Sequence, residues 1–485
     1  MNRYKAANDT IHTPGHLVRA VSRPKKRRSL WTGAAAGATA MAIFAAMLLW
    51  PVSPAPETPN DNPVKQPLIP VAHAAEVLAQ PTLPTMAPAP DFSGHWSDEE
   101  YEAWRESRLT RWQQRPEDDS ALDAFYLETA REFLLNSAGE NALYSPLNLY
   151  LGLGMLAEVT DGQTREQILE LLNCDSVEEL RAFVSALWNV NYCDDGAVTS
   201  LLASSLWLRD DTEYRMETLG TLADSYYASS HRGTMGSEEY NRMLRDWTNE
   251  HTGNLLTEQA NRLEMNAATV LALVSTLYFE ASWGDKFSPD ATAPDTFHTP
   301  DGDVTVDFLN RTADQEYYWD EDFAAVELPL SGSGSMWLFL PDEDKTVADL
   351  LDGSALELIR NPYDWENWTY IQVELSVPKF DVTGQPDLYT GLQNLGITDV
   401  FDWTKADFSP LCENHDQIYL SNASHCARVM IDENGCTGAA FTMLGMETAA
   451  IPPEEIAVFR ADRPFLFAVT GQDNQILFLG VVNEP

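Results

Sequence analysis

The chain has 485 residues and a formal net charge of −43, which allows one large domain or two with a sizeable core. Residues 1–28 carry eight Lys or Arg against one acidic residue, so residues 29–485 carry about −50. This acidic body argues against nucleic-acid binding. The five cysteines show no CxxC spacing, so we expect no zinc site, no disulfide framework and no cofactor.

Residues 30–50 form an uncharged apolar run directly after a basic cluster at residues 23–28. As a helix this run spans roughly 30 Å, about one hydrocarbon core. The positive-inside rule then places residues 1–29 in the cytoplasm and the remainder outside the cell. The alternative is a signal peptide cut at Ala72-His73-Ala74, about 24 residues past the run, which is farther than the usual arrangement. We expect an uncleaved, single-pass anchor in the cell membrane.

The segment after the anchor changes composition twice. Residues 51–93 are rich in proline and predict an extended extracellular tether. Residues 94–117 combine acidic and aromatic residues and predict a short helix. A globular domain is then expected over 118–485, beginning with a helix at 121–135 and a second helix opened by Ser145-Pro146.

The later part of the chain is rich in strand patterns. Helices early and strands late predict an α+β domain rather than regular βαβ winding. The expected strands are 201–208, 270–279, 324–330, 336–340, 371–380, 465–469 and 476–482.

The stretch from Glu433 to Ile451 is long, consists mainly of small, hydroxyl or apolar residues, and is almost free of charge. It lies between an acidic start and Pro452-Pro453, and contains no proline and only one internal charge, Glu447. Such a segment suits an exposed loop, and its composition also suits a buried strand. This dual character predicts a segment that switches between the two states.

Several motifs in order resemble those of the serpin family over roughly residues 120–485. They are NALYSPLNLYLGLGMLAEVTDGQTREQI (141–168), WTNEHTGNLL (247–256), LALVSTLYFEASWGDKF (271–287), AVELPLSGSGSMWLFLP (325–341), VPKFDVTG (377–384), LGITDVF (395–401), HCARVMIDENGCTGAA (425–440) and DRPFLFAVTGQDNQILFLGVVNEP (462–485). The resemblance implies a serpin fold with a large central β-sheet, two smaller sheets, about nine helices and an exposed C-terminal reactive loop. It also implies inhibition of serine proteases by a loop that is cleaved and then inserts into the main sheet.

By analogy with the family's spacing, the reactive bond joins Ala449 and Ala450, although Thr448 or Ala450 could take the place of Ala449 if the register slips. An alanine here implies an elastase-like or subtilisin-like target rather than a trypsin-like one, because it offers no cation. The resemblance places the hinge of the loop at Glu433, Gly435, Cys436, Thr437, Gly438, Ala439, Ala440, Phe441 and Thr442.

Four hinge residues depart from the family pattern: Cys436, Thr437, Gly438 and Phe441. None is a proline or a charge, so none blocks insertion outright. Counting back from Ala449, the residues expected to face the core after insertion are Cys436, Gly438, Ala440, Thr442, Leu444 and Met446. All of these are small or apolar, and none carries a charge to desolvate.

The resemblance also implies a polar cluster beneath the sheet that governs its opening. Its members here are Ser145, Asn148, Ser275 and His425, and Trp283 matches a tryptophan near the entry point of the loop. Asn148 and Ser275 exchange the family's usual residue types, which suggests a compensated swap in which the Asn148 amide partners His425. The alternative is a satisfied polar patch without a mechanical role.

The sequence contains no motif that supports an enzymatic function. The chain has no GxSxG, HExxH or phosphate-binding glycine loop, and SGSGS at 331–335 predicts a hairpin turn. We therefore expect a monomeric, membrane-anchored bacterial protease inhibitor that is not an enzyme and binds no nucleic acid or metal. A non-inhibitory binding protein whose loop is cut as a substrate, and an anchored sensor acting through residues 1–29, stay open as alternatives.

Overall fold

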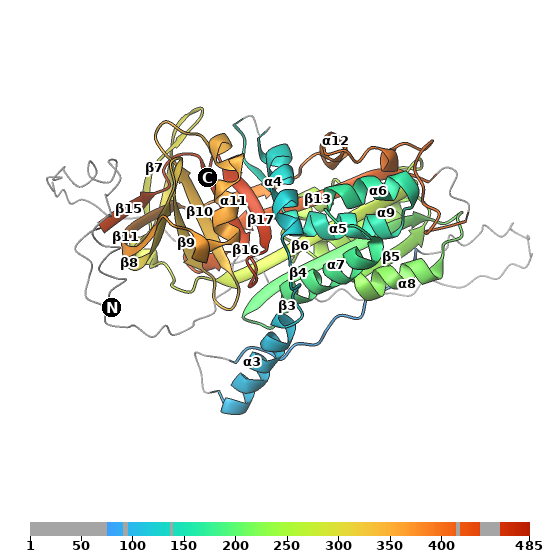
Figure 1. The fold of residues 1–485 in the computed structure, drawn as a ribbon, viewed down its shortest axis with the longest axis horizontal. Coiled ribbons are helices and arrows are strands. Elements are labelled where there is room, and N and C mark those ends of the chain that lie inside the picture. Colours follow the sequence, from blue (N-terminus) through green and yellow to red (C-terminus); the bar gives the residue numbers. More distant parts are fainter. Residues whose placement is uncertain (1–74, 91–95, 136–138, 414–417, 437–455) are drawn as a thin grey trace, which may run out of the picture. The chain divides into compact units, whose positions relative to one another are not determined.

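The computed structural model describes residues 75–90, 96–135, 139–413, 418–436 and 456–485 (Figure 1). The expected anchor at 30–50, the hinge beyond Cys436 and the bond between Ala449 and Ala450 lie outside these ranges. Within the described ranges, no helix combines the length and apolar character needed to cross a membrane.

Eight strands form the main sheet, in which long strands far apart in the chain lie side by side. Its order is β1-β5-β4-β6-β13-β12, with β3 paired to β4 and β14 paired to β6. The bounds are β1 Glu76–Ala79, β3 Cys193–Asp194, β4 Val198–Arg209, β5 Ala228–Gly233, β6 Leu271–Ser282, β12 Asp381–Gly384, β13 Leu420–Met430 and β14 Gly435–Cys436.

Nine strands form a second sheet in the order β15-β11-β8-β9-β10-β16-β17-β2, with β7 paired to β8. The bounds are β2 Ala142–Tyr144, β7 Ala293–Thr299, β8 Gly302–Trp319, β9 Phe323–Pro329, β10 Ser335–Pro341, β11 Trp368–Pro378, β15 Ile456–Arg460, β16 Phe465–Thr470 and β17 Ile476–Val482. The two smaller sheets of the sequence prediction are therefore one hydrogen-bonded sheet in the described residues. The reason is β8, whose 18 residues pair with β7 and β11 and, at their end, with β9.

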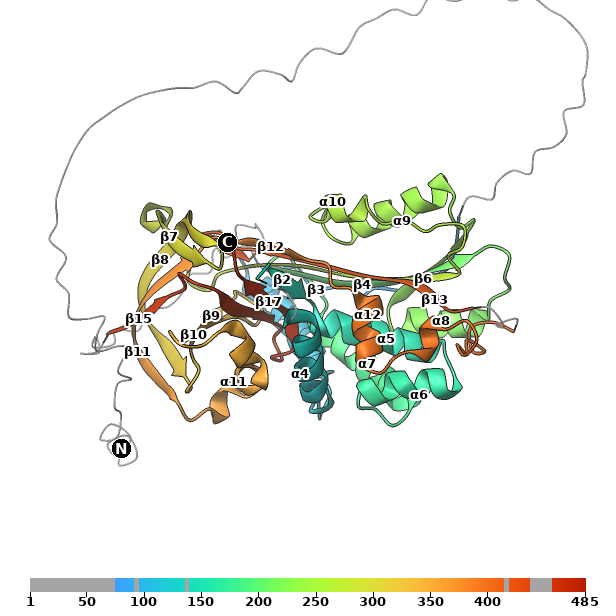
Figure 2. The same cartoon turned by 90° about the horizontal axis from the view of Figure 1, so that it is seen from above.

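Ten α-helices and four short 3-10 helices lie in the described ranges. They are α3 Asp98–Trp112, α4 Ala121–Leu134, α5 Pro146–Glu158, α6 Gly162–Leu171, α7 Val177–Asn191, α8 Met216–Ser225, α9 Glu238–Glu250, α10 Thr257–Ala260, α11 Ser354–Arg360, α12 Leu388–Asn394, η1 Pro289–Ala291, η2 Val347–Asp352, η3 Pro362–Asp364 and η4 Asp399–Phe401. Figure 2 shows α9 and α10 on one face of the main sheet and α5 to α8 on the other.

Helix α5 lies at the centre of the core. Its sequence, PLNLYLGLGMLAE, is apolar on all sides, and every one of its residues is buried. A helix of this kind is stable only when protein surrounds it. Ser145 caps its start by accepting a hydrogen bond from the Asn148 N–H, and Pro146 supplies the first turn, as the sequence predicts.

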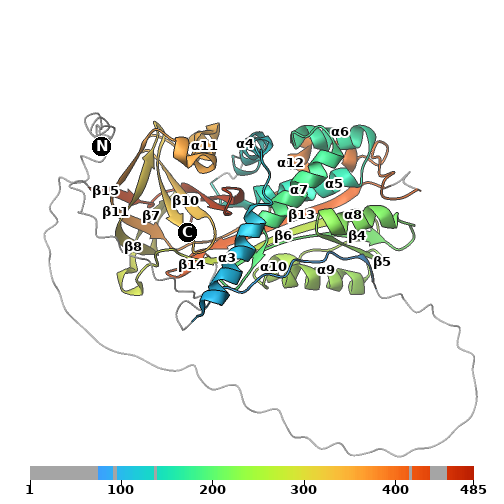
Figure 3. The same cartoon turned by 60° about the horizontal axis from the view of Figure 1, so that its bottom comes forward.

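Most predicted elements are confirmed within a few residues of their expected ends. Figure 3 shows α3, predicted from residues 94–117, beside the main sheet. Several strands were not expected, among them the 18-residue β8. Another is β1, which falls inside the range predicted as tether and pairs antiparallel with β5.

Candidate functional site

An opening between two central strands is the main feature of the large sheet. β6 pairs with β4 along its whole length, from Leu271 to Ala281. On its other edge, β6 pairs in parallel with β13 only as far as Thr276, which lies opposite Cys426. In the described part of the chain, residues 277–280 have no strand partner on this edge. The sheet therefore has room for a further strand between β6 and β13.

The chain enters this opening at β14. Gly435 pairs antiparallel with Ser282, and Cys436 pairs with Ala281 on one side and bridges to Ile431 on the other. A tight turn precedes the strand, because the Asp432 N–H donates to the carbonyl of Gly435 at 3.1 Å. Gly435 and Cys436, two residues of the predicted hinge, are thus already part of the sheet.

Trp283 lies at this entry point, as the resemblance implies. Its side chain is buried, and its indole Nε1–H donates to the carbonyl of Asp432 at 2.8 Å. Its backbone N–H donates to the carbonyl of Asn434 at 2.9 Å. Trp283 therefore holds the turn that directs the chain into the opening.

Glu433 is fixed by two partners that the sequence did not reveal. Its carboxylate accepts hydrogen bonds from Lys379 Nζ at 3.0 Å and from Thr292 Oγ1 at 2.8 Å. Burial alone would raise the pKa of Glu433, but these hydrogen bonds outweigh it and hold the pKa below its usual value. Lys379 belongs to the VPKF motif, so the sequence could have indicated it as a site residue, whereas Thr292 lies in no motif.

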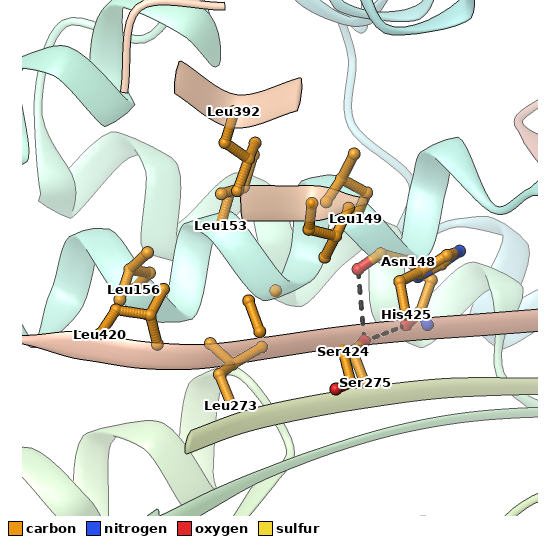
Figure 4. Close-up of a pocket in the computed structure, with 13 residues that line it drawn as sticks. Asn148, Leu149, Leu153, Leu156, Leu273, Ser275, Leu392, Leu420, Ser424 and His425 are labelled. Atoms are coloured by element: carbon orange, nitrogen blue, oxygen red, sulfur yellow. Dashed lines mark hydrogen bonds between the residues drawn. The ribbon is translucent and has the colours of Figure 1, made fainter. Parts of the chain in front are cut away.

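Three of the four polar residues beneath the sheet lie together in Figure 4: Asn148 of α5, Ser275 of β6 and His425 of β13. The fourth, Ser145, precedes α5 as its N-cap. Ser275 Oγ donates to Asn148 Oδ1 at 2.7 Å and lies 3.3 Å from Ser204 Oγ. The Ser145 backbone N–H donates to His425 Nε2 at 2.8 Å. Ser204, on β4, was missed by the sequence prediction, although it pairs directly with Ser275.

The geometry corrects one detail of the expected swap. The Asn148 amide oxygen pairs with Ser275, while the partner of His425 Nε2 is the backbone of Ser145. Asn148 Nδ2 is buried, and no acceptor for it lies among the described residues. Burial lowers the pKa of His425 to about 4, so the ring is neutral at pH 7 and can accept through Nε2.

The two faces of β6 meet different surroundings. Leu273, Leu277 and Phe279 belong to the main hydrophobic core, which also contains α5. Ala272 and Val274 face the smaller core under α9. Directly opposed residues of an antiparallel pair share a face, so a strand added beside β6 would alternate between these two cores.

All five cysteines lie in the described ranges, and none forms a disulfide. Cys436 is buried at the start of β14, and Cys426 is buried in β13. Burial raises the pKa of Cys426 to about 11, so its thiol is protonated at pH 7.

Comparisons with known proteins agree with this geometry. The family model described as serpin (serine protease inhibitor) matches residues 120–485. The leukocyte elastase inhibitor of Sus scrofa is 28% identical over 378 residues, which cover 76% of this chain and 99% of that protein.

Two solved structures share the fold. The thermophilic serpin tengpin in its native state has a TM-score of 0.68 at 23% identity, covering 76% of this chain and 96% of its own. Human thyroxine-binding globulin complexed with thyroxine has a TM-score of 0.65 at 22% identity, covering 78% of this chain and 99% of its own. The expected serpin fold is confirmed, and the family model describes serine protease inhibitors rather than enzymes. The chain belongs to the serpin family.

Proposed function

We propose that this protein is a suicide-substrate inhibitor of serine endopeptidases. The protease serine attacks the carbonyl of Ala449, and the peptide bond to Ala450 breaks, which leaves an acyl-enzyme. The freed loop then enters the main sheet as a new strand, carries the protease with it and distorts its active site. The observation that carries the proposal is the register of β14 beside the opening between β6 and β13.

The register of β14 can be extended one residue at a time. Each step forward from Cys436 is one step back along β6 from Ala281, so Ala440 would pair with Leu277 and Thr442 with Ser275. Every second loop residue then faces the main core, starting with Cys436, which is buried there. This set is the one that the sequence pattern predicts, and it contains no charge. The match supports insertion without the cost of burying an ion.

The target is proposed to be elastase-like or subtilisin-like. Ala449 fills only a shallow apolar pocket and gives a trypsin-like pocket no cation to pair with. The similarity to the leukocyte elastase inhibitor of Sus scrofa is in keeping with this choice. We further propose that the protein acts as a monomer on the outer side of a bacterial cell membrane, held there by residues 30–50.

The experiment mixes the full-length protein with an elastase-type and a trypsin-type protease and runs denaturing gels. A covalent band with the elastase-type enzyme and cleavage after Ala449 are expected. The matched variant Ala449→Arg should move the covalent band to the trypsin-type enzyme. Cleavage of the wild type without any covalent band would contradict inhibition.

A second candidate is a non-inhibitory serpin whose loop is cut as a substrate or whose state is sensed. Gly438 and Phe441 favour it, because both depart from the small, strand-forming residues usual at the hinge. Thyroxine-binding globulin, which shares the fold, binds a hormone. Clean cleavage with release of active protease is the outcome that would favour this candidate.

A further inference from the structure

Residues 75–90 and 96–112 precede the part of the chain that the family model matches, yet β1 and α3 within them contact the main sheet. Strand β1 pairs with β5, with Glu76 opposite Arg232. The two side chains also form an ion pair at 2.6 Å. This part of the chain therefore adds an edge strand to the main sheet, which is the sheet with the opening between β6 and β13.

Helix α3 is attached to the same sheet at two places: Arg111 donates to the carbonyl of Tyr192, just before β3, and the buried carboxylate of Asp195 accepts from two other side chains of the helix. Asp195 Oδ2 accepts from Trp104 Nε1 at 2.8 Å and from Arg108 Nη1 at 3.0 Å. Its Oδ1 accepts from the N–H groups of Ala197 and Val198, both at 3.0 Å. Because Asp195 lies in the turn that begins β4, the helix is fixed to the start of this strand.

Arg108 makes a second contact that reaches the other sheet. Its Nη2 donates to the carbonyl of Gly332, in the turn between β9 and β10. The same turn is held to the end of β6, because the Ser331 N–H donates to the carbonyl of Ser282 at 2.8 Å. One guanidinium group therefore links the start of β4 to a turn that is already fastened to β6.

These contacts lie at the end of the sheet where the further strand begins. Val198 of β4 pairs with Ala281 of β6, and Ala281 pairs with Cys436 of β14. β4 and β6 are paired throughout, so they must move together when β6 separates from β13. The turn at Gly332 belongs to the second sheet through β9 and β10. The Arg108 contact at the start of β4 and the Ser331–Ser282 hydrogen bond at the end of β6 therefore both tie this pair of strands to the second sheet, and both oppose a movement away from β13.

We propose that residues 75–90 and 96–112 form a brace that holds the main sheet closed and sets the rate at which it accepts another strand. Arg108 is the positioning residue of this brace. The brace acts through two acceptors, Asp195 and Gly332, and needs the forked guanidinium to reach both. The proposal rests on loop insertion for its purpose, but its opening step can be measured without a protease.

The test is hydrogen–deuterium exchange of the full-length protein at residues 277–281 and 426–430, which border the opening. In Arg108→Ala, exchange there should be about tenfold faster, the scale of ~1.4 kcal/mol. Exchange in β16 and β17 should stay unchanged. The control is Arg105→Ala, because Arg105 lies on the same helix and, among the residues that the structure describes, forms its ion pair with the exposed Glu102. That variant should behave as the wild type.

A third variant separates bridging from simple charge pairing. Arg108→Lys can keep the ion pair with Asp195 but cannot span both acceptors, so it should resemble Arg108→Ala. The brace is overturned if Arg108→Ala matches Arg105→Ala, if Arg108→Lys matches the wild type, or if exchange rises equally in β16 and β17. A protein that never traps a protease can still show faster hydrogen–deuterium exchange in Arg108→Ala than in Arg105→Ala. Failure of the brace and failure of the proposed inhibition are therefore distinguishable.

Discussion

Gly152 gives the sharpest stability prediction, because it lies in the buried helix α5 directly under β6. A Cβ added at Gly152 would meet Leu273 Cδ2 at 3.7 Å and Ser275 Cβ at 3.8 Å, which are ordinary contact distances. It would border a small cavity of about 20 Å³. Gly152→Ala should therefore be accepted without movement of its neighbours.

The magnitude follows from two terms. Replacing glycine by alanine inside a helix contributes about 1 kcal/mol of stability. Burying the added methyl group contributes about 0.8 kcal/mol. Gly152→Ala should therefore raise the free energy of unfolding by about 1.5–2 kcal/mol. At this chain length each kcal/mol raises Tm by about 1 °C, so a rise of about 2 °C is expected.

The matched control is Gly154→Ala, two residues along the same helix. Its Cβ would lie 2.9 Å from Val184 Cγ2 and 3.4 Å from Tyr226 Cε1, so Val184 must move. Overpacking of this kind costs about 1–3 kcal/mol and cancels the helical gain. Thermal and urea unfolding of the two variants measure the difference. Equal shifts for both, or a lower Tm for Gly152→Ala, would refute the reasoning.

Three further predictions concern the opening of the sheet. A double-mutant cycle of Asn148→Ala and Ser275→Ala should give a coupling energy of about 1 kcal/mol in urea unfolding, and additive effects would contradict their hydrogen bond. Burial lowers the pKa of His425 from 6.5 to about 4 in the folded protein. Between these two pH values the unfolded chain binds a proton that the folded protein does not, so the free energy of unfolding falls by about 3 kcal/mol as the pH drops from 6.5 to 4. Unfolding of His425→Asn at several pH values should lack this component of the slope, and an unchanged slope would count against it. Ala440→Arg should turn the protein into a substrate, because the extended register of β14 points residue 440 into the core. Ala439→Arg should still form the covalent band with the protease. Identical gels for the two variants would exclude the extended register of β14.

The sequence could predict those parts of the fold whose signals lie within a few neighbouring residues. The start of α5 was predictable because a serine cap and a proline stand together at Ser145-Pro146. β1 was not predictable, because EVLA is a four-residue stretch among prolines and gains its partner, β5, from about 150 residues away. Pairing over such a separation leaves no periodic mark in either segment.

The candidate site shows the same division. The types and places of Ser275 and His425 followed from motifs, but their partners did not. Sequence reasoning assigned the Asn148 amide to His425, whereas a backbone N–H occupies that acceptor. Backbone donors look identical at every position of a sequence, so only the fold reveals which one points at a side chain.

Phe441 is the hinge residue whose fit depends on the far face of the sheet. In the proposed extension of the β14 register it would lie opposite Thr276, which is buried and shares a face of β6 with Ala272 and Val274, beneath α9. In the proposed mechanism a phenylalanine would have to find room there before the strand could close, and that delay would give the acyl-enzyme time to hydrolyse. Phe441→Ala removes the obstacle and should raise the fraction of protease trapped rather than released several-fold. The measurement is the number of inhibitor molecules consumed per protease inactivated. An unchanged or higher number for Phe441→Ala would mean that the side chain enters freely and that α9 does not control the rate.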